Sequence, residues 1–364
     1  MAYTTIDDGS VYFQMDLYTG DGQGSGNNVI TNDGNSDLQP DWIWTKERTS
    51  TSGNQNHTFI DTTRGINKQL FGNLTSADAT SSNFITQIDS DGFRLGDNAN
   101  INNNSSNYVA WQWKANGGTT STNNDGSYTS TVQANTTAGF SIVKYGDATS
   151  FSASTPATVG HGLGKAPKWV IIKNLDGDRD WGVHHAGLTD AQKIIYLNLN
   201  NAEANSSGFM NSTAPSSTVF TVNTLNVANG NNLEYIAYCF AEIQGYSKFG
   251  SYTGNGNADG PFIYTGFKPA WVMVKKTSDT HSWYMQYGST GIDTGDQGSN
   301  PVKSSLQANS NSGDATENSM DFLSNGFKIR TSGNGHNTSS GTYIYMAFAE
   351  HPFVSSKGAP VTAR

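Results

Sequence analysis

The chain has a single cysteine in 364 residues. Cys239 lies within the apolar run YIAYCFA, where a thiol packs as a small hydrophobic side chain. Without a second cysteine no intramolecular disulfide can form. The fold must therefore be held together by packing and hydrogen bonds alone.

Charge is also scarce, and basic residues are in the minority. Only 14% of the residues are charged, and 21 Lys and Arg against 30 Asp and Glu give a formal net charge of -9. A negatively charged chain without a cluster of Lys and Arg is not attracted to phosphate backbones, so nucleic acid is not expected as a partner.

Long apolar runs are absent as well. The first residues, MAYTTIDDGS, contain neither a basic segment nor an apolar one. No stretch of about 18 apolar residues occurs in the sequence. We expect neither export by a signal peptide nor insertion into a membrane.

Turn-forming and aromatic residues are what the chain has in quantity. Its 40 glycines, together with many Asn, Ser and Thr, supply tight corners, and its 16 Tyr, 17 Phe and 8 Trp argue against disorder. This composition is typical of short strands joined by turns. We predict an all-β protein with little helix.

One short segment occurs three times. It begins with proline, carries tryptophan two residues later and ends with lysine: PDWIWTK at Pro40, PKWVIIK at Pro167 and PAWVMVK at Pro269. Since side chains alternate between the two faces of a strand, the tryptophan and the lysine of each copy lie on the same face. A self-similar chain is best interpreted as repeated units before any motif is given a function.

Further segments recur in the same order around each copy. An aromatic, glycine-bearing stretch comes before it: DLYTGDG, SIVKYGD and GSYTGNG. A phenylalanine that opens the next strand comes after it: Phe93, Phe220 and Phe327. A closing apolar strand follows: YVAWQWKA at Tyr108, YIAYCFAE at Tyr235 and YIYMAFAE at Tyr343. Units two and three also share Trp181 and Trp283 at one spacing from their prolines, where unit one has only HTFID nearby.

These repeats predict three β-sandwich units in tandem. The units are residues 1–116, 138–245 and 246–364, with a polar, turn-rich connection at 117–137. Each suits a two-sheet antiparallel sandwich of the jelly-roll or lectin-like kind. We expect three small cores in a row, and hence a long rigid body. The terminal glutamates Glu242 and Glu350 are expected to pair with the repeated lysines Lys173 and Lys275.

No catalytic or metal-binding pattern stands out. GHGLGK, residues 160–165, lacks the Ser or Thr and the helix that follow a phosphate-binding loop. DGDRD, residues 176–180, begins like a calcium loop but lacks its turn glycine and its bidentate glutamate. His184 and His185 are adjacent, so in a strand they point to opposite faces and cannot chelate one metal together. We predict no metal, no cofactor and no enzymatic activity.

Exposed aromatic residues are the remaining candidates for a binding site. Ring faces cover the apolar faces of sugars, while amides and acids bind the hydroxyl groups. The glycan-binding hypothesis rests on Trp181, His184, His185, Trp283, Tyr284 and Tyr287. The alternative is that these rings pack against the opposite sheet, as large aromatic residues of sandwiches usually do.

Several segments resemble a repeated module of structural proteins from marine tailed phages, cyanophages in particular. QPDWIWTKER, IDSDGFRLG and YVAWQWKANGG carry the likeness in unit one. GFSIVKYGD, GHGLGKAPKWVIIKN and YIYMAFAEHPFV extend it over nearly the whole chain. The chain departs from the module where TTRG replaces an SRG-type segment and where unit three has a longer central insertion.

The resemblance implies a virion component that is assembled in the host cytoplasm and contacts other virion proteins. The first hypothesis is a tail-fibre or appendage adhesin that binds host surface polysaccharide. The alternative is a capsid decoration or adaptor protein that clamps neighbouring subunits. A homo-oligomer is expected, because structural phage proteins usually form closed symmetric assemblies, and trimers are common in fibres. An enzyme that degrades host polysaccharide is a third hypothesis, for which no paired carboxylates can be assigned.

Overall fold

The computed structural model describes residues 3–24, 28–49, 53–149, 151–288 and 300–360. These residues form 27 strands, three α-helices of four residues each and one short 3-10 helix. All named sheets are antiparallel, so the predicted all-β fold with little helix is confirmed. No helix in the described ranges is long and apolar enough to cross a membrane.

Unit one contains two sheets. Its elements are η1 (Gly9–Val11), β1 (Phe13–Thr19), β2 (Val29–Ile30), β3 (Trp42–Thr49), β4 (Thr58–Asp61), β5 (Lys68–Phe71), β6 (Ala79–Thr80), β7 (Ile85–Asp89), β8 (Gly92–Leu95), α1 (Ala99–Asn102) and β9 (Asn107–Trp113). The main sheet has the order β1-β9-β3-β4-β5-β6, and the second sheet has the order β2-β8-β7.

Unit two repeats this plan and adds two strands. Its elements are β10 (Ser121–Asn123), β11 (Ser130–Asn135), β12 (Phe140–Gly146), β13 (Ala157–Gly160), β14 (Trp169–Asn174), β15 (Gly182–His185), β16 (Lys193–Tyr196), β17 (Ala204–Asn205), α2 (Ser207–Met210), β18 (Val219–Val222) and β19 (Glu234–Phe240). Its main sheet runs β10-β11-β12-β19-β14-β15-β16-β17, opposite the pair β13-β18. The segment 117–137, expected as a connection, therefore supplies β10 and β11 to this sheet.

Unit three joins its two layers into one sheet. Its elements are β20 (Ser247–Thr253), β21 (Phe262–Tyr264), β22 (Phe267–Lys276), β23 (Trp283–Tyr287), β24 (Val302–Gln307), β25 (Ala315–Leu323), β26 (Gly326–Ile329), α3 (Asn334–Asn337) and β27 (Thr342–Pro352). The order is β20-β27-β22-β23-β24-β25-β26-β21.

The repeated sequence segments occupy the same place in all three main sheets. The strands with the tryptophan and lysine are β3, β14 and β22, and each pairs with the closing strand of its own unit. Their registers agree, since Trp42 lies opposite Trp113, Trp169 opposite Phe240 and Trp271 opposite Phe348. The internal repeat is thus a repeat of structure as well as of sequence.

Each of these strands is buried on both faces. In β3, Trp42 and Trp44 point to the centre of the molecule, whereas Ile43 points to the second sheet of unit one. The same alternation sends Ile171 of β14 to the centre and Val170 to the second sheet of unit two. The main sheets are therefore middle layers, and only one of their two faces belongs to a sandwich core.

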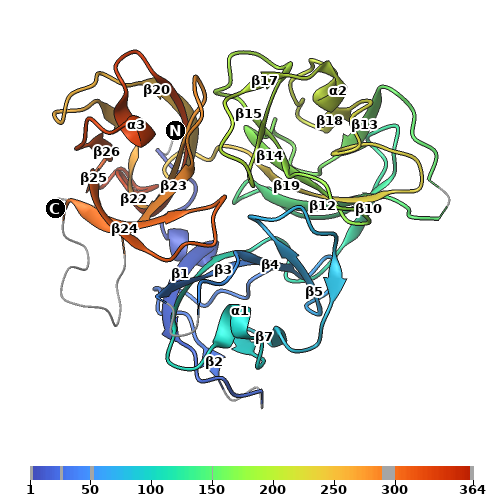
Figure 1. Cartoon of the computed structure of the whole chain (residues 1–364), viewed down its shortest axis with the longest axis horizontal. Coiled ribbons are helices and arrows are strands. Elements are labelled where there is room, and N and C mark those ends of the chain that lie inside the picture. The colour runs from blue at the N-terminus through green and yellow to red at the C-terminus, as the bar shows by residue number, and fades with distance from the viewer. Residues whose placement is uncertain (1–2, 25–27, 50–52, 150, 289–299, 361–364) are drawn as a thin grey trace.

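The centre of the molecule is one core shared by the three units. Trp113, Phe240 and Phe348 hold the same register position, and their rings meet pairwise with centroids 6.2, 5.6 and 5.7 Å apart. These contacts define a pseudo-threefold axis, and Figure 1 shows the three units arranged around it. Each unit keeps a sandwich core of its own, but the expected row of separate units is wrong, because the inward faces of all three main sheets also pack into one shared cluster.

All eight tryptophans are fully buried, six of them on the repeated and closing strands. Burying about 150–250 Å² of aromatic surface stabilises the fold by roughly 4–6 kcal/mol per ring as an upper bound. Most of the tryptophans in the sequence therefore serve to build the core that the three units share.

Candidate functional site

Five of the six predicted glycan-binding residues lie inside the protein. Trp181, His184, His185, Trp283 and Tyr287 are at most 3% exposed, and only Tyr284 reaches the surface. A sugar ring cannot stack on a buried face. The expectation of exposed rings is therefore wrong for these five. They are buried, as the alternative predicted, but Trp181, Trp283 and Tyr287 pack in the core shared by the units and not against the opposite sheet.

Two of the buried tryptophans join neighbouring units. Nε1 of Trp181 donates hydrogen bonds to the carbonyl oxygens of Phe71 and Leu74 in unit one, at 3.0 and 3.1 Å. Nε1 of Trp283 donates to the carbonyl oxygen of Tyr196 in unit two at 2.9 Å. Phe71 and Tyr196 are the last residues of equivalent strands, β5 and β16. The same contact therefore occurs at two of the three junctions.

A histidine makes the third junction. His57 directly precedes β4, as Trp181 directly precedes β15, and its Nε2 lies 3.0 Å from the carbonyl oxygen of Gln307. Gln307 ends β24, the strand of unit three equivalent to β5. The HTFID segment of unit one thus replaces the tryptophan with a smaller ring that keeps the contact. These three contacts close the ring of units.

Tyr287 and His185 also bind across unit boundaries. The Tyr287 hydroxyl accepts a hydrogen bond from Nε of Arg48 in unit one at 2.9 Å and donates one to Asp314 at 3.0 Å. Nε2 of His185 lies 3.1 Å from the carbonyl oxygen of Tyr345 in unit three. Burial and the neighbouring His184 lower the pKa of His185 to about 3, so the ring is neutral. These residues hold the body together.

The repeated lysines lie at the same junctions. Nζ of Lys173 donates to the carbonyl oxygen of Thr75 in unit one at 2.8 Å, and Nζ of Lys275 donates to that of Asn200 in unit two at 3.3 Å. Burial lowers the pKa of Lys46, Lys173 and Lys275 to about 8, 8 and 7. Each amine satisfies carbonyl groups that would otherwise be buried without a partner.

The predicted pairing of Glu242 and Glu350 with these lysines is wrong. Glu242 pairs with Lys248 and Glu350 pairs with Lys268, both at 2.7 Å. Both pairs lie partly exposed at the ends of their sheets, whereas Lys173 and Lys275 are fully buried. Backbone carbonyls, which are plentiful where two units meet, replace carboxylates as acceptors.

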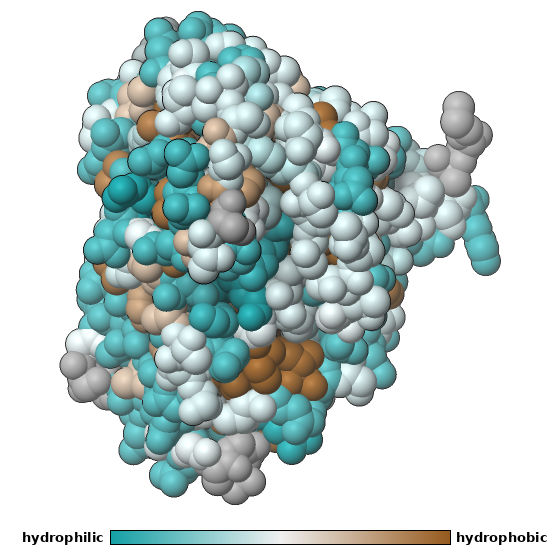
Figure 2. Space-filling model, turned by 90° about the vertical axis from the view of Figure 1, so that its right-hand side faces the viewer, coloured by the Kyte–Doolittle hydropathy of each residue, from teal (hydrophilic) through white to brown (hydrophobic). Residues whose placement is uncertain are grey.

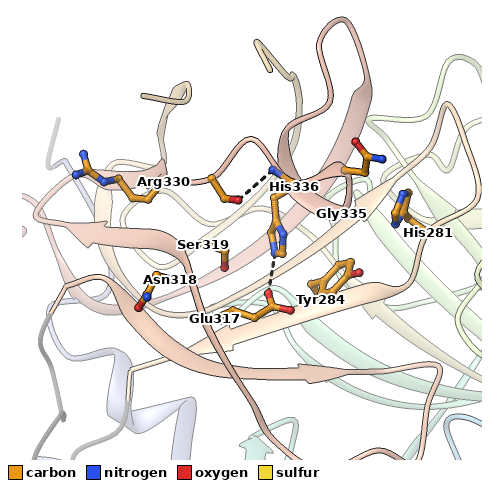
Figure 3. A pocket seen from close by; sticks show the side chains of 11 residues that line it. His281, Tyr284, Glu317, Asn318, Ser319, Arg330, Gly335 and His336 are labelled. Carbon is orange, nitrogen blue, oxygen red and sulfur yellow. Dashed lines mark hydrogen bonds and ion pairs between the residues drawn. The ribbon is translucent and has the colours of Figure 1, made fainter. Parts of the chain in front are cut away.

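Tyr284 lines a depression in unit three with a volume of about 470 Å³. Figure 3 shows Glu317 and His336 pointing toward each other, Tyr284 and His281 on one side, and Arg330 and Asn318 on the other. The ring of Tyr284 packs on His336 with centroids 4.6 Å apart. A side chain at Gly335 would come within 2.5 Å of that ring, so glycine is needed there. The depression is formed by β23, β25 and the loop around α3.

The floor of this depression is polar where unit one is apolar. His336 and Ile101 are equivalent, because each precedes an asparagine, Asn337 or Asn102, whose side chain binds the carbonyl six residues earlier. Gln286 and Ile60 are also equivalent. Gln286 lies opposite Val272 of the repeated strand in unit three, and Ile60 lies opposite Ile43 of the repeated strand in unit one. Three replacements result, all at buried positions: Ile60 by Gln286, Phe84 by Ser319 and Ile101 by His336.

The three polar residues form one network. Nε2 of Gln286 lies 3.2 Å from the Ser319 hydroxyl and 3.0 Å from Nε2 of His336, while its Oε1 is buried without a hydrogen-bond partner. Burial lowers the pKa of His336 to about 4, so its ring is neutral near pH 7. A buried acceptor without a partner is destabilising by about 1–3 kcal/mol. Such a group is uncommon in a folded protein and marks this network as unlike the apolar core of unit one.

Glu317 gives the depression its carboxylate. One of its oxygens lies 4.0 Å from Nε2 of His336. Burial and the nearby Asp314 raise the pKa of Glu317, although a hydrogen bond with Ser305 opposes this shift. Neither Glu317 nor His336 was singled out from the sequence. For His336, the sequence contains one indication, which is that unit three has a histidine where unit one has an isoleucine.

Two smaller depressions lie elsewhere. One, of about 370 Å³, lies in unit one between β1 and β2 and contains Asp16 and Asp33. Burial and the charge of Asp33 raise the pKa of Asp16 to about 7. The other, of about 250 Å³, lies between units one and three and is lined by Lys268 and Glu350. Elsewhere too, no group of three His, Cys, Asp or Glu side chains among the described residues is arranged so that it could hold a metal ion.

Comparison with known protein families gives one match, over residues 8–352, to a domain of unknown function, DUF7483. The chain belongs to the DUF7483 family. Because the match runs from η1 to the end of β27, this family is defined by the whole three-unit body rather than by a single repeat. No curated protein and no solved structure was found to match the chain.

Proposed function

We propose that this protein is a structural component of a phage virion, exposed on the particle as an adhesin that binds host surface polysaccharide through the depression in unit three. One observation carries the proposal: three core positions that are apolar in unit one are polar in unit three, directly beside the accessible ring of Tyr284. Polar residues in a sandwich core destabilise the fold unless they are fully hydrogen-bonded, and natural proteins depart from an apolar core mainly at functional sites.

The chemistry of the depression suits a sugar. An aromatic ring, side-chain amides, a hydroxyl and a carboxylate converge there, and these are the groups that bind sugar hydroxyls and apolar sugar faces. Its volume of about 470 Å³ is within the usual range for small-molecule sites. The phage context comes from the sequence resemblance, and the rigid closed body is compatible with a protein that must resist the environment outside the cell.

Glycan arrays and host-cell pull-downs test the proposal. The wild-type protein should bind host polysaccharide above a control protein, and Tyr284→Ala should lose this binding. Tyr264→Ala is the matched control, because Tyr264 is another tyrosine of unit three, 52% exposed on β21 and outside the depression. Binding by neither variant nor wild type would contradict the adhesin function. Release of reducing ends from purified host envelope would indicate an enzyme instead.

A capsid decoration or adaptor protein is the alternative, and the surface offers one observation in its favour. Phe262 and Tyr264 are 45% and 52% exposed on β21, which lies at the edge of its sheet. Exposed aromatic residues on a sheet edge are typical of contacts with another protein. Figure 2 views another face, on the side of unit two, which is mostly hydrophilic or neutral with one compact apolar area in its lower half.

Particle stability tests this alternative. Virions that carry the double variant Phe262→Ser and Tyr264→Ser should lose the protein, or should become sensitive to heat and osmotic shock. Equal resistance of particles without the protein would count against clamping. The proposed homo-oligomer would also have to use such outer surfaces, because the threefold contacts are already made within one chain.

A further inference from the structure

The charge inside the depression of unit three is set by one carboxylate. Glu317 reaches into it from β25, and Nε2 of His336, which faces it among the described residues, is 4.0 Å away. His336 is buried and its ring is neutral, since burial lowers its pKa to about 4. Partial burial and the charge of Lys276 lower the pKa of His281 as well, although the charge of Asp279 opposes this shift. Neither histidine compensates the charge of Glu317.

The arginine at the rim is already engaged. Nε of Arg330 lies 3.4 Å from a carboxylate oxygen of Asp321, and about half of its side chain is exposed. In Figure 3 it lies on the far side of the depression from Tyr284. An acidic ligand would therefore meet a carboxylate on the floor and a cation whose charge is largely balanced.

The remaining groups are neutral hydrogen-bonding groups. The side chains of Asn318 and Ser319 line the site, and behind Ser319 and His336 the buried Oε1 of Gln286 has no partner. Such groups match the hydroxyls of an uncharged sugar. We infer that the depression selects neutral sugar residues and rejects sugars that carry a carboxylate, with Glu317 as the residue that sets this specificity. This inference rests on the proposed adhesin function.

A pair of oligosaccharides with the same linkage tests the selection. One is a neutral glucan oligosaccharide and the other is its counterpart oxidised to glucuronate at the 6-position. Isothermal titration calorimetry with the full chain should show binding of the neutral compound. The acidic compound should bind at least roughly tenfold more weakly, since two like charges about 5 Å apart at a protein surface repel by more than the equivalent of tenfold.

Removal of the carboxylate should remove the discrimination. Glu317→Gln keeps the shape and the hydrogen-bonding capacity of the side chain, so affinity for the neutral compound should stay within about threefold while that for the acidic one rises roughly tenfold. Glu234→Gln is the matched control, because this glutamate pairs with Lys144 in unit two, far from the site. It should leave both affinities unchanged.

A second variant locates the binding site independently. His336→Ile introduces the residue that unit one has at this position, so the protein should fold, and the larger apolar side chain should abolish binding of both compounds. Binding retained by His336→Ile would place the site elsewhere and overturn the inference. Equal affinity of the wild type for both compounds, or an unchanged ratio in Glu317→Gln, would also overturn it while leaving the adhesin function standing. Failure of the wild type to bind any glycan would instead contradict the adhesin function itself.

Discussion

His336 in unit three occupies the position of Ile101 in unit one, and both are buried before an asparagine that ties down the same loop. Gln286 is likewise the counterpart of Ile60, and in unit three the two polar side chains contact each other at 3.0 Å. Unit one is therefore a natural control for unit three. The two units share one fold, but the equivalent positions are apolar in unit one and polar in unit three.

The double variant Gln286→Ile and His336→Ile should be more stable than the wild type by about 1 kcal/mol, because replacing both members of a buried hydrogen-bonded pair removes an unpaired acceptor and restores apolar packing. Urea unfolding measures the difference. Gln286→Ile alone, which leaves His336 without its partner, should be less stable than the double variant. A double variant less stable than the wild type by roughly 2 kcal/mol or more would mean that the two sandwich cores are not equivalent.

Buried histidines should make the protein sensitive to mild acid. Burial lowers the pKa of His184 to about 4, whereas the unfolded chain titrates near 6.5. Between these values the unfolded state binds more protons, so stability falls as the pH falls from about 6.5 to about 4, by at most about 1.4 kcal/mol per pH unit for each such histidine.

His184→Ile provides the comparison, since Ile60 is the counterpart of His184 in unit one. The variant should show a flatter decline of melting temperature between pH 6.5 and pH 4.5 than the wild type. Parallel declines would show that His184 does not contribute to acid sensitivity.

The buried lysines extend the same trend into alkaline solution. The pKa of Lys275 is lowered from 10.5 to about 7 by burial, so between these values the unfolded chain again binds more protons. Stability should therefore rise as the pH increases from about 7 toward 9.5. Lys275→Met removes the titrating group, and the difference in unfolding free energy between the variant and the wild type should change with pH over this range. A constant difference would contradict a depressed pKa.

Loss of a junction hydrogen bond can be separated from loss of aromatic volume. Trp181→Phe removes the donor that binds the carbonyl oxygens of Phe71 and Leu74, and leaves these acceptors facing a phenyl ring. Trp169→Phe is the control, because its indole nitrogen is buried without a partner among the described residues. We expect Trp181→Phe to be less stable than Trp169→Phe by about 1–3 kcal/mol. Equal losses in chemical denaturation would mean that packing alone joins the units.

Heating should unfold the three units together. Their inward faces form one core around Trp113, Phe240 and Phe348, so no unit can leave without exposing the other two. Calorimetry should show a single transition whose calorimetric and van't Hoff enthalpies agree. A chain that ends at residue 245 should be insoluble or unfolded. Separate transitions would argue for three independent cores.

Much of the local structure follows from the sequence. The alternation in PDWIWTK, PKWVIIK and PAWVMVK predicts strands with tryptophan and lysine on one face, and β3, β14 and β22 have that arrangement. What packs against that face cannot be predicted from the sequence. An alternation with a period of two gives the side of the sheet on which a residue lies, but it does not give the element that covers this side. The tryptophans therefore looked like candidates for three separate cores or for a surface, and they form one shared centre instead.

The site shows the same division. Tyr284 was singled out from its neighbourhood of aromatic residues, whereas Gln286, Ser319 and His336 were not, because they come from three distant segments. Only the paired registers show that these positions are apolar in unit one. His57 was missed for a related reason, since a histidine that takes the place of a tryptophan leaves no repeat in the letters of the sequence.

The sequence by itself determined the strands, the all-β class and the threefold repeat, because alternation and turn chemistry act over a few neighbouring residues. Tertiary structure alone decided that the units close into a ring around one core and that unit three has a polar depression. The ring depends on side chains more than 100 residues apart in the sequence, and the depression depends on three separate segments of unit three that meet in space, so no local pattern encodes either feature.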